Sequence, residues 1–92
     1  MLEVSIERRL VEKVKRLQGW AVKFDSPGTA GMPDRLVILP EGRMIFVELK
    51  APGKRPRPLQ QARIDQLKKL GCRVYVLDSP AAVDQFIEEL TK

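Results

Sequence analysis

The 92-residue sequence contains no histidine and a single cysteine, Cys72. Without histidine, neither a Ser-His-Asp nor a Cys-His catalytic apparatus can form, and a zinc site built from His and Cys is excluded. One cysteine cannot form a disulfide within the chain. Because Cys72 follows Gly71 at the start of an apolar run, it is better interpreted as a buried structural thiol than as a nucleophile. Chemistry here must rest on carboxylates, Lys, Arg or a hard metal ion.

Long apolar runs are also missing. No segment approaches the ~18 apolar residues of a transmembrane helix, and the N-terminus lacks the apolar region of a signal peptide. We therefore expect a soluble cytoplasmic protein without a membrane partner. With 43% hydrophobic and 32% charged residues and no biased tract, the composition predicts one folded domain over residues 1–92. A domain this small buries a limited core, which favours dimerisation.

Positive charge is in excess and is unevenly distributed. Seventeen Lys and Arg against twelve Asp and Glu give a net charge of +5. Residues 50–57 carry four basic side chains and no acid. A positive field of this kind suits a phosphate-bearing polymer, although four basic residues alone more often form a solvated face.

Apolar periodicity predicts the order of the elements. Residues 2–17 form an amphipathic helix, ended by Gly19, whose buried stripe is Leu2, Ile6, Leu10, Val14 and Leu17. Short strands are predicted at residues 20–24, 36–39, 44–49 and 73–77, and further helices at 58–70 and from Pro80 onward, with Ser79 as cap. The order αβββαβα predicts an α/β fold in which helices flank a central mixed sheet.

A three-residue loop, Pro40 to Gly42, joins the second and third strands. Pro at its first place and Gly at its third suit a type I turn closed by a left-handed Gly. Counting back from this loop sets Asp34 opposite Glu48. Directly opposite side chains have Cβ atoms about 5 Å apart, close enough for two carboxylates to share one cation. Lys50 lies on the same strand face as Glu48.

Two carboxylates and a lysine at one strand end suggest metal-assisted hydrolysis of a phosphodiester. Unpaired carboxylates at that distance repel, so they share a proton or bind a cation, and all-oxygen ligation suits Mg²⁺ or Mn²⁺. Lys50 could stabilise negative charge on the reacting phosphate or orient the attacking water. The alternatives are that Glu48 and Lys50 form the salt bridge common to Glu-x-Lys patterns in strands, and that Asp34 belongs to an ordinary turn.

The roles of two further side chains, Glu7 and Gln60, are left undecided by the sequence pattern alone. Glu7 lies at the edge of the first helix's apolar stripe, where it either reaches over the sheet or pairs with a neighbouring Lys or Arg. Gln60 points the same way as the apolar face of its helix, where it either meets the strand-end carboxylates or bonds to backbone and water.

The combined motifs resemble a known nuclease family. Pro33-Asp34, followed after thirteen residues by Glu48-Leu49-Lys50, is similar to the PD-(D/E)xK superfamily with its restriction-endonuclease-like core. Within it, the VRR-NUC family is resembled by three stretches: Gly31-Met32-Pro33-Asp34-Arg35, Val47-Glu48-Leu49-Lys50-Ala51-Pro52-Gly53 and Pro58-Leu59-Gln60. The resemblance runs from the first helix to the strand at residues 73–77.

The resemblance implies a role for each motif residue. Asp34 and Glu48 match the metal-binding acids, with the Leu49 backbone carbonyl as a further ligand for Mg²⁺ or Mn²⁺. Lys50 matches the catalytic lysine. Gln60 matches the motif glutamine. Glu7 matches the acid from the first helix, which would be a further metal ligand. The resemblance therefore favours a functional role for both residues.

The resemblance also implies a substrate and an assembly. Family members of this small stand-alone type are phage or bacterial proteins, and they act on structured DNA such as flaps or, as homodimers, four-way junctions. We expect no organic cofactor. Side chains expected to contact DNA phosphates are Lys54, Arg55, Arg57, Arg35 and Lys23. The rival hypothesis is a DNA-binding module without hydrolytic activity that uses the basic loop for backbone contacts.

Overall fold

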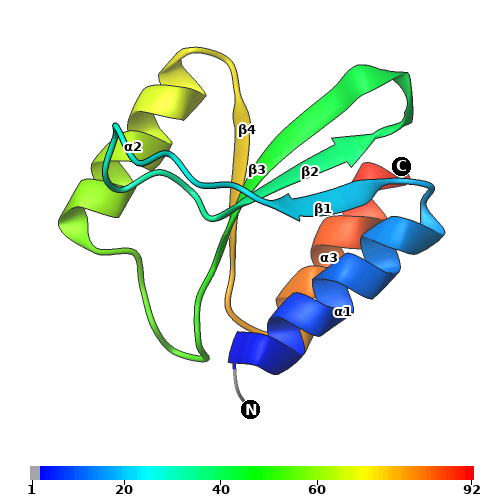
Figure 1. Cartoon of the computed structure of the whole chain (residues 1–92). Coiled ribbons are helices and arrows are strands. Elements are labelled where there is room, and N and C mark those ends of the chain that lie inside the picture. Colours follow the sequence, from blue (N-terminus) through cyan, green and yellow to red (C-terminus); the bar gives the residue numbers. More distant parts are fainter. Residues whose placement is uncertain (1–2) are drawn as a thin grey trace.

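The fold is a four-stranded mixed sheet with three helices (Figure 1). The computed structural model describes residues 3–92, so Leu2 of the predicted first stripe lies outside the described residues. Sheet order is β1-β2-β3-β4, antiparallel except for the parallel β3–β4 pair, which confirms the predicted α/β class and element order. The elements are α1 (Glu3–Arg16), β1 (Trp20–Lys23), β2 (Arg35–Leu39), η1 (Pro40–Gly42), β3 (Arg43–Leu49), α2 (Pro58–Lys69), β4 (Arg73–Leu77) and α3 (Pro80–Leu90).

Helices α1 and α3 lie side by side against one face of the sheet (Figure 1). The apolar stripes that predicted these helices are buried: Ile6, Leu10 and Val14 on α1, and Val83, Phe86 and Leu90 on α3. They pack against alternate residues of the inner strands, among them Val37, Ile45, Val47 and Leu49. Burial of these side chains, at roughly 1.5–3 kcal/mol each, holds β2 and β3 in place beneath the helices.

Helix α2 crosses from β3 to β4 and lies apart from the other two helices (Figure 1). Its first residue, Pro58, supplies the fixed φ that suits a helix start. Ile64 is buried on its inner side. At the start of α3, the Ser79 hydroxyl accepts a hydrogen bond from the Ala82 N–H at 3.0 Å, which confirms Ser79 as the cap.

The end of α1 differs in detail from the prediction. Gln18, not Gly19, takes the left-handed conformation, with φ 65°. The N–H of Gln18 donates to the Lys15 carbonyl and that of Gly19 to the Val14 carbonyl, both at 3.0 Å, which is a Schellman ending. Glycine is required at position 19 because the chain passes close to β2 there: a Cβ would lie 2.8 Å from the Ile38 carbonyl oxygen.

The β2–β3 hairpin has the predicted register and a different turn. Leu39 pairs with Arg43 and Arg35 with Val47, as the three-residue loop requires. Glu41 has φ 71° and ψ 17°, however, and Gly42 has φ 76°. A left-handed residue directly after Pro40 does not fit the predicted type I turn, and it fits the third position of a type II turn. The loop thus contains two consecutive left-handed residues, of which only Gly42 is a glycine.

Replacing Gly42 by Ala should destabilise the protein by about 1–2 kcal/mol, the cost of a left-handed non-glycine residue. Gly28→Ala is the matched control, since both positions have open space for a Cβ but only Gly42 has a positive φ. We expect Gly28→Ala to change the free energy of unfolding by less than about 0.5 kcal/mol. Urea denaturation measures both, and equal effects would contradict the assigned turn.

Candidate active site

Asp34 lies just before β2, at the end of the sheet where β3 finishes. Continuing the ladder one step beyond the Arg35–Val47 pair sets Asp34 across from Glu48. The N–H of Leu49 donates to Asp34 Oδ1 at 3.0 Å, and the Asp34 carbonyl accepts from the Phe24 N–H at 2.9 Å. The carboxylate is therefore tied to β3 while its own backbone is tied to the end of β1.

Glu48, Lys50 and Gln60 form a connected cluster beside Asp34. Glu48 is only 4% exposed, and its Oε2 accepts from Gln60 Nε2 at 3.1 Å and lies 3.3 Å from Lys50 Nζ. Lys50 Nζ also donates to Gln60 Oε1 at 2.8 Å. The Lys50 N–H donates to the Leu77 carbonyl, extending the ladder with β4 by one residue. The structure thus brings together three predicted residues from β3, the segment after it and α2.

The loop before Asp34 is packed against α2, as its path in Figure 1 indicates. Gly31 has φ 85°, and a Cβ there would lie 2.9 Å from Leu59 Cγ and 3.1 Å from the Leu59 carbonyl oxygen. Arg63 Nε donates to the Ala30 carbonyl at 2.9 Å. Helix α2 therefore supplies Gln60 and also holds the segment that carries Asp34.

Both carboxyl groups are placed where ionisation is costly. Burial raises the pKa of Asp34, and the hydrogen bond from the Leu49 N–H opposes that rise only in part. Burial also raises the pKa of Glu48, with the charge of Asp34 as the second cause and Lys50 opposing both. A bound cation would favour the ionised form of both groups.

The donor set fits a hard divalent cation. Within residues 3–92, no three His, Cys, Asp or Glu residues lie close enough together to hold a metal ion. Two carboxylates are nevertheless what Mg²⁺ commonly takes from a protein, with waters and substrate phosphate oxygens completing its shell. Asp34 and Glu48 are the candidate ligands, and the Leu49 carbonyl stays a prediction.

Glu7 and Arg35 are arranged differently from the prediction. Arg35 Nη2 lies 2.7 Å from Glu7 Oε2, and Arg35 Nη1 donates to the Ala21 carbonyl at 3.2 Å. The Arg35 side chain is 7% exposed and paired with Glu7, which disfavours the predicted contact with DNA phosphates. Glu7 takes the alternative of an ion pair, with an arginine from β2 rather than one from its own helix. That pairing leaves Glu7 a weaker candidate for a metal ligand.

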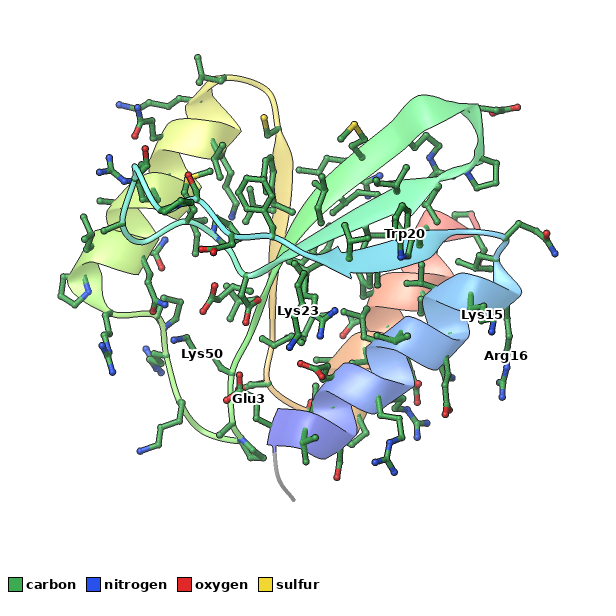
Figure 2. All side chains as sticks on the ribbon, in the orientation of Figure 1. Glu3, Lys15, Arg16, Trp20, Lys23 and Lys50 are labelled. Atoms are coloured by element: carbon green, nitrogen blue, oxygen red, sulfur yellow. The ribbon has the colours of Figure 1, made fainter. Side chains whose placement is uncertain are left out.

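Glu3 is the acid of α1 that the sequence reasoning missed. Burial is the main cause of the raised pKa of Asp34, and the negative charge of Glu3 adds to it. Figure 2 shows Glu3 at the start of α1, at the end of the molecule where Lys50 lies and far from Trp20. Its spacing could have indicated that Glu3 lies near the site, because it is four residues before Glu7 and therefore on the same side of the helix.

The remaining basic residues of the prediction are at the surface. Lys54, Arg55 and Arg57 are exposed on the segment between β3 and α2, and Lys23 is exposed at the end of β1. A hydrogen bond from the Lys54 N–H to the Ala51 carbonyl, at 3.0 Å, forms a turn in this segment. Their positions suit long-range attraction of a polyanion.

Three comparisons identify what the chain is similar to. The family model described as "VRR-NUC domain" matches residues 5–81. A protein of Acyrthosiphon pisum secondary endosymbiont phage 1, named "Putative nuclease p44", is 54% identical over 77 residues, covering 84% of this chain and 83% of that protein. A solved structure described as "VRR_NUC domain" superposes with a TM-score of 0.87 at 36% identity, covering 94% of each chain.

Asp34→Asn should stabilise the metal-free protein at pH 7, because asparagine keeps an oxygen for the Leu49 N–H without a buried charge. Since the pKa of Asp34 is raised on folding, its cost to stability is absent at low pH and appears as pH rises through the folded pKa. The stabilisation should therefore vanish near about pH 3, below the ordinary aspartate pKa. Urea denaturation in the presence of a chelator at both pH values measures this.

Asp84→Asn is the matched control of opposite sign. Arg9 and Lys13 hold the pKa of the Asp84 carboxyl well below its usual range, so its ionised form stabilises the fold above the unfolded pKa. Asp84→Asn should lower stability at pH 7. If Asp34→Asn lowered it as well, the cost assigned to the buried carboxylate would be wrong.

Proposed function

The chain belongs to the VRR-NUC domain family, and from that premise we propose that it is a divalent-metal-dependent endonuclease that hydrolyses phosphodiester bonds in DNA. The observation that carries the proposal is the pair of acids, Asp34 and Glu48, set at one sheet end beside Lys50 and Gln60. A module that only binds phosphates has no use for two carboxylates beside its ligand, which disfavours the rival hypothesis.

Each residue of the site has a proposed task. Asp34 and Glu48 bind Mg²⁺ or Mn²⁺, together with the Leu49 carbonyl. When bound, such an ion polarises a phosphate oxygen and lowers the pKa of a coordinated water. Lys50 presents its ammonium to the charge that develops on the phosphate, or orients the attacking water. Gln60 holds that ammonium through its Oε1.

The DNA substrate is proposed to be branched, such as a four-way junction or a flap. Lys54, Arg55, Arg57 and Lys23 would hold phosphates without reading bases. The similarity to a phage protein suggests a setting in the bacterial cytoplasm, on branched intermediates of DNA repair or replication. No helix within residues 3–92 is long and apolar enough to cross a membrane.

A homodimer is proposed to form through the sheet face opposite α1 and α3. Trp20, Ile38 and Met44 are directly paired across three strands and so share this face, and Trp20 and Met44 are 67% and 55% exposed. A hollow of about 510 Å³ adjoins this patch, and its lining includes Met44 itself together with Leu36, Phe46 and Cys72. Apolar patches of this kind commonly mark protein interfaces. Two copies packed here would present two sites to one junction.

Cleavage of labelled junction, flap and duplex DNA, with Mg²⁺, with Mn²⁺ and with a chelator, tests the activity. We expect cleavage only with metal, and Asp34→Ala should lose at least about 100-fold in rate. Glu88→Ala, which removes an exposed acid on α3, should cleave like wild type. Intact substrates with the wild type, or equal cleavage by Asp34→Ala, would refute the nuclease assignment.

Met44→Glu should convert the proposed dimer to a monomer, because it places a charge in the apolar interface. Val4→Glu is the control. Val4 is an apolar residue that is 54% exposed, and it lies on α1, which packs against the other face of the sheet. Light scattering at micromolar concentration measures both masses. A monomeric wild type, or a dimeric Met44→Glu variant, would contradict the interface.

A further inference from the structure

The turn that precedes α2 contacts the catalytic cluster through its backbone. The N–H of Arg57 donates to Gln60 Oε1 at 2.9 Å, while the Arg57 carbonyl accepts from the Gln61 N–H at 2.9 Å. A helix residue at the third position that reaches back to the preceding N–H is half of a capping box. Here the same Oε1 also accepts from Lys50 Nζ at 2.8 Å. The helix start and the catalytic lysine therefore share one acceptor atom.

This sharing fixes which way the Gln60 amide faces. Its oxygen meets two donors, Arg57 N–H and Lys50 Nζ, and its NH₂ group donates to Glu48 Oε2. A turned-over amide would place the NH₂ group against both donors and its oxygen against a carboxylate, so all three contacts would be repulsive. Lys50 can swing on its flexible stem, whereas a backbone N–H cannot. The rigid determinant of the orientation is therefore Arg57.

The Arg57 backbone is held by its neighbours in sequence. It lies between Pro56 and Pro58, with φ −67° and ψ 161°. A residue before proline is restricted to extended conformations, which keeps the direction of its N–H constant. The donor is thus pre-set by the chain itself and does not depend on the exposed guanidinium of Arg57.

We propose that the backbone N–H of Arg57 is a positioning group for Lys50 and acts through Gln60. By locking the amide, it keeps the Lys50 ammonium at 2.8 Å from Gln60 Oε1 and at 3.3 Å from Glu48 Oε2. The ammonium is thereby shared rather than fully paired with the carboxylate that is proposed to bind metal. The inference rests on the proposed nuclease function for its kinetic consequence, but not for the contact itself.

The φ of Arg57 allows the N–H to be deleted selectively. Proline requires φ near −65°, so Arg57→Pro fits the observed backbone and removes both the N–H and the side chain. Arg57→Ala removes the side chain alone and is the reference. Both variants should bind junction DNA equally, and more weakly than wild type, because both lose a proposed phosphate contact. Only Arg57→Pro should lose the orientation of Gln60.

Single-turnover cleavage at saturating DNA and Mg²⁺ measures the kinetic effect. We expect Arg57→Pro to be about 10- to 100-fold slower than Arg57→Ala, the usual cost of losing a group that orients a site residue. In a Gln60→Ala background the difference between the two should disappear. Equal rates for the two variants, or a difference that persists without Gln60, would overturn the proposal.

Nuclear magnetic resonance of the metal-free protein tests the contact without any cleavage. The order parameter of Gln60 Nε2 should fall below about 0.6 in Arg57→Pro and stay higher in Arg57→Ala. In addition, Gln60→Ala in the otherwise unchanged protein should speed hydrogen exchange at the Arg57 amide. Unchanged order and unchanged exchange would refute the positioning role even in an active nuclease. An inactive wild type with the expected order and exchange would refute only the nuclease function.

Discussion

Two carboxylates forced together at the end of a buried β-ladder are the constraint around which this protein is arranged. Glu48 is buried and Asp34 is half-buried; burial raises the pKa of each carboxyl group, and the charge of Asp34 raises that of Glu48 further. Three hydrogen-bond donors around the two carboxyl groups reduce the cost of ionising them. One N–H from Leu49, one amide from Gln60 and one ammonium from Lys50 face the pair. If the pair binds a cation, as proposed, the stability lost by burying two carboxylates is the cost of that function.

The fold positions these groups by dividing the work between two sides of the sheet. Helices α1 and α3 bury the apolar side of β2 and β3, and so fix the ladder that sets Asp34 against Glu48. Helix α2 holds the loop before Asp34 through Gly31 and Arg63, and it delivers Gln60. The sheet face opposite α1 and α3 exposes Trp20 and Met44, which is why it is proposed as the dimer interface.

Much of this arrangement follows from local rules that can be read in the sequence. A three-residue loop fixes hairpin register whatever its turn type, so the opposition of Asp34 and Glu48 was predictable although Glu41 was not recognised as left-handed. Gln60 was placed correctly because its helix phase is set by buried neighbours such as Ile64. Periodicity and loop length were sufficient for both.

Contacts between elements distant in sequence could not be predicted in this way. Periodicity places Glu7 at the edge of the α1 stripe, but it cannot show that a buried Arg35 from β2 pairs with it. The pairing also buries the Arg35 side chain, and the α1 acid whose charge adds to the raised pKa of Asp34 is Glu3. Gly19 was identified as a helix end by residue type, whereas the close approach of Ile38 is what requires it.

The central claim is that Asp34 and Glu48 bind one divalent cation, and Mn²⁺ titration of ¹⁵N-labelled protein tests it most directly. Paramagnetic broadening should begin at the Leu49 amide, which donates to Asp34, and at the side-chain amide of Gln60, which donates to Glu48. Broadening that instead begins around exposed acids such as Asp84 or Glu88, with Leu49 and Gln60 unaffected, would contradict the account.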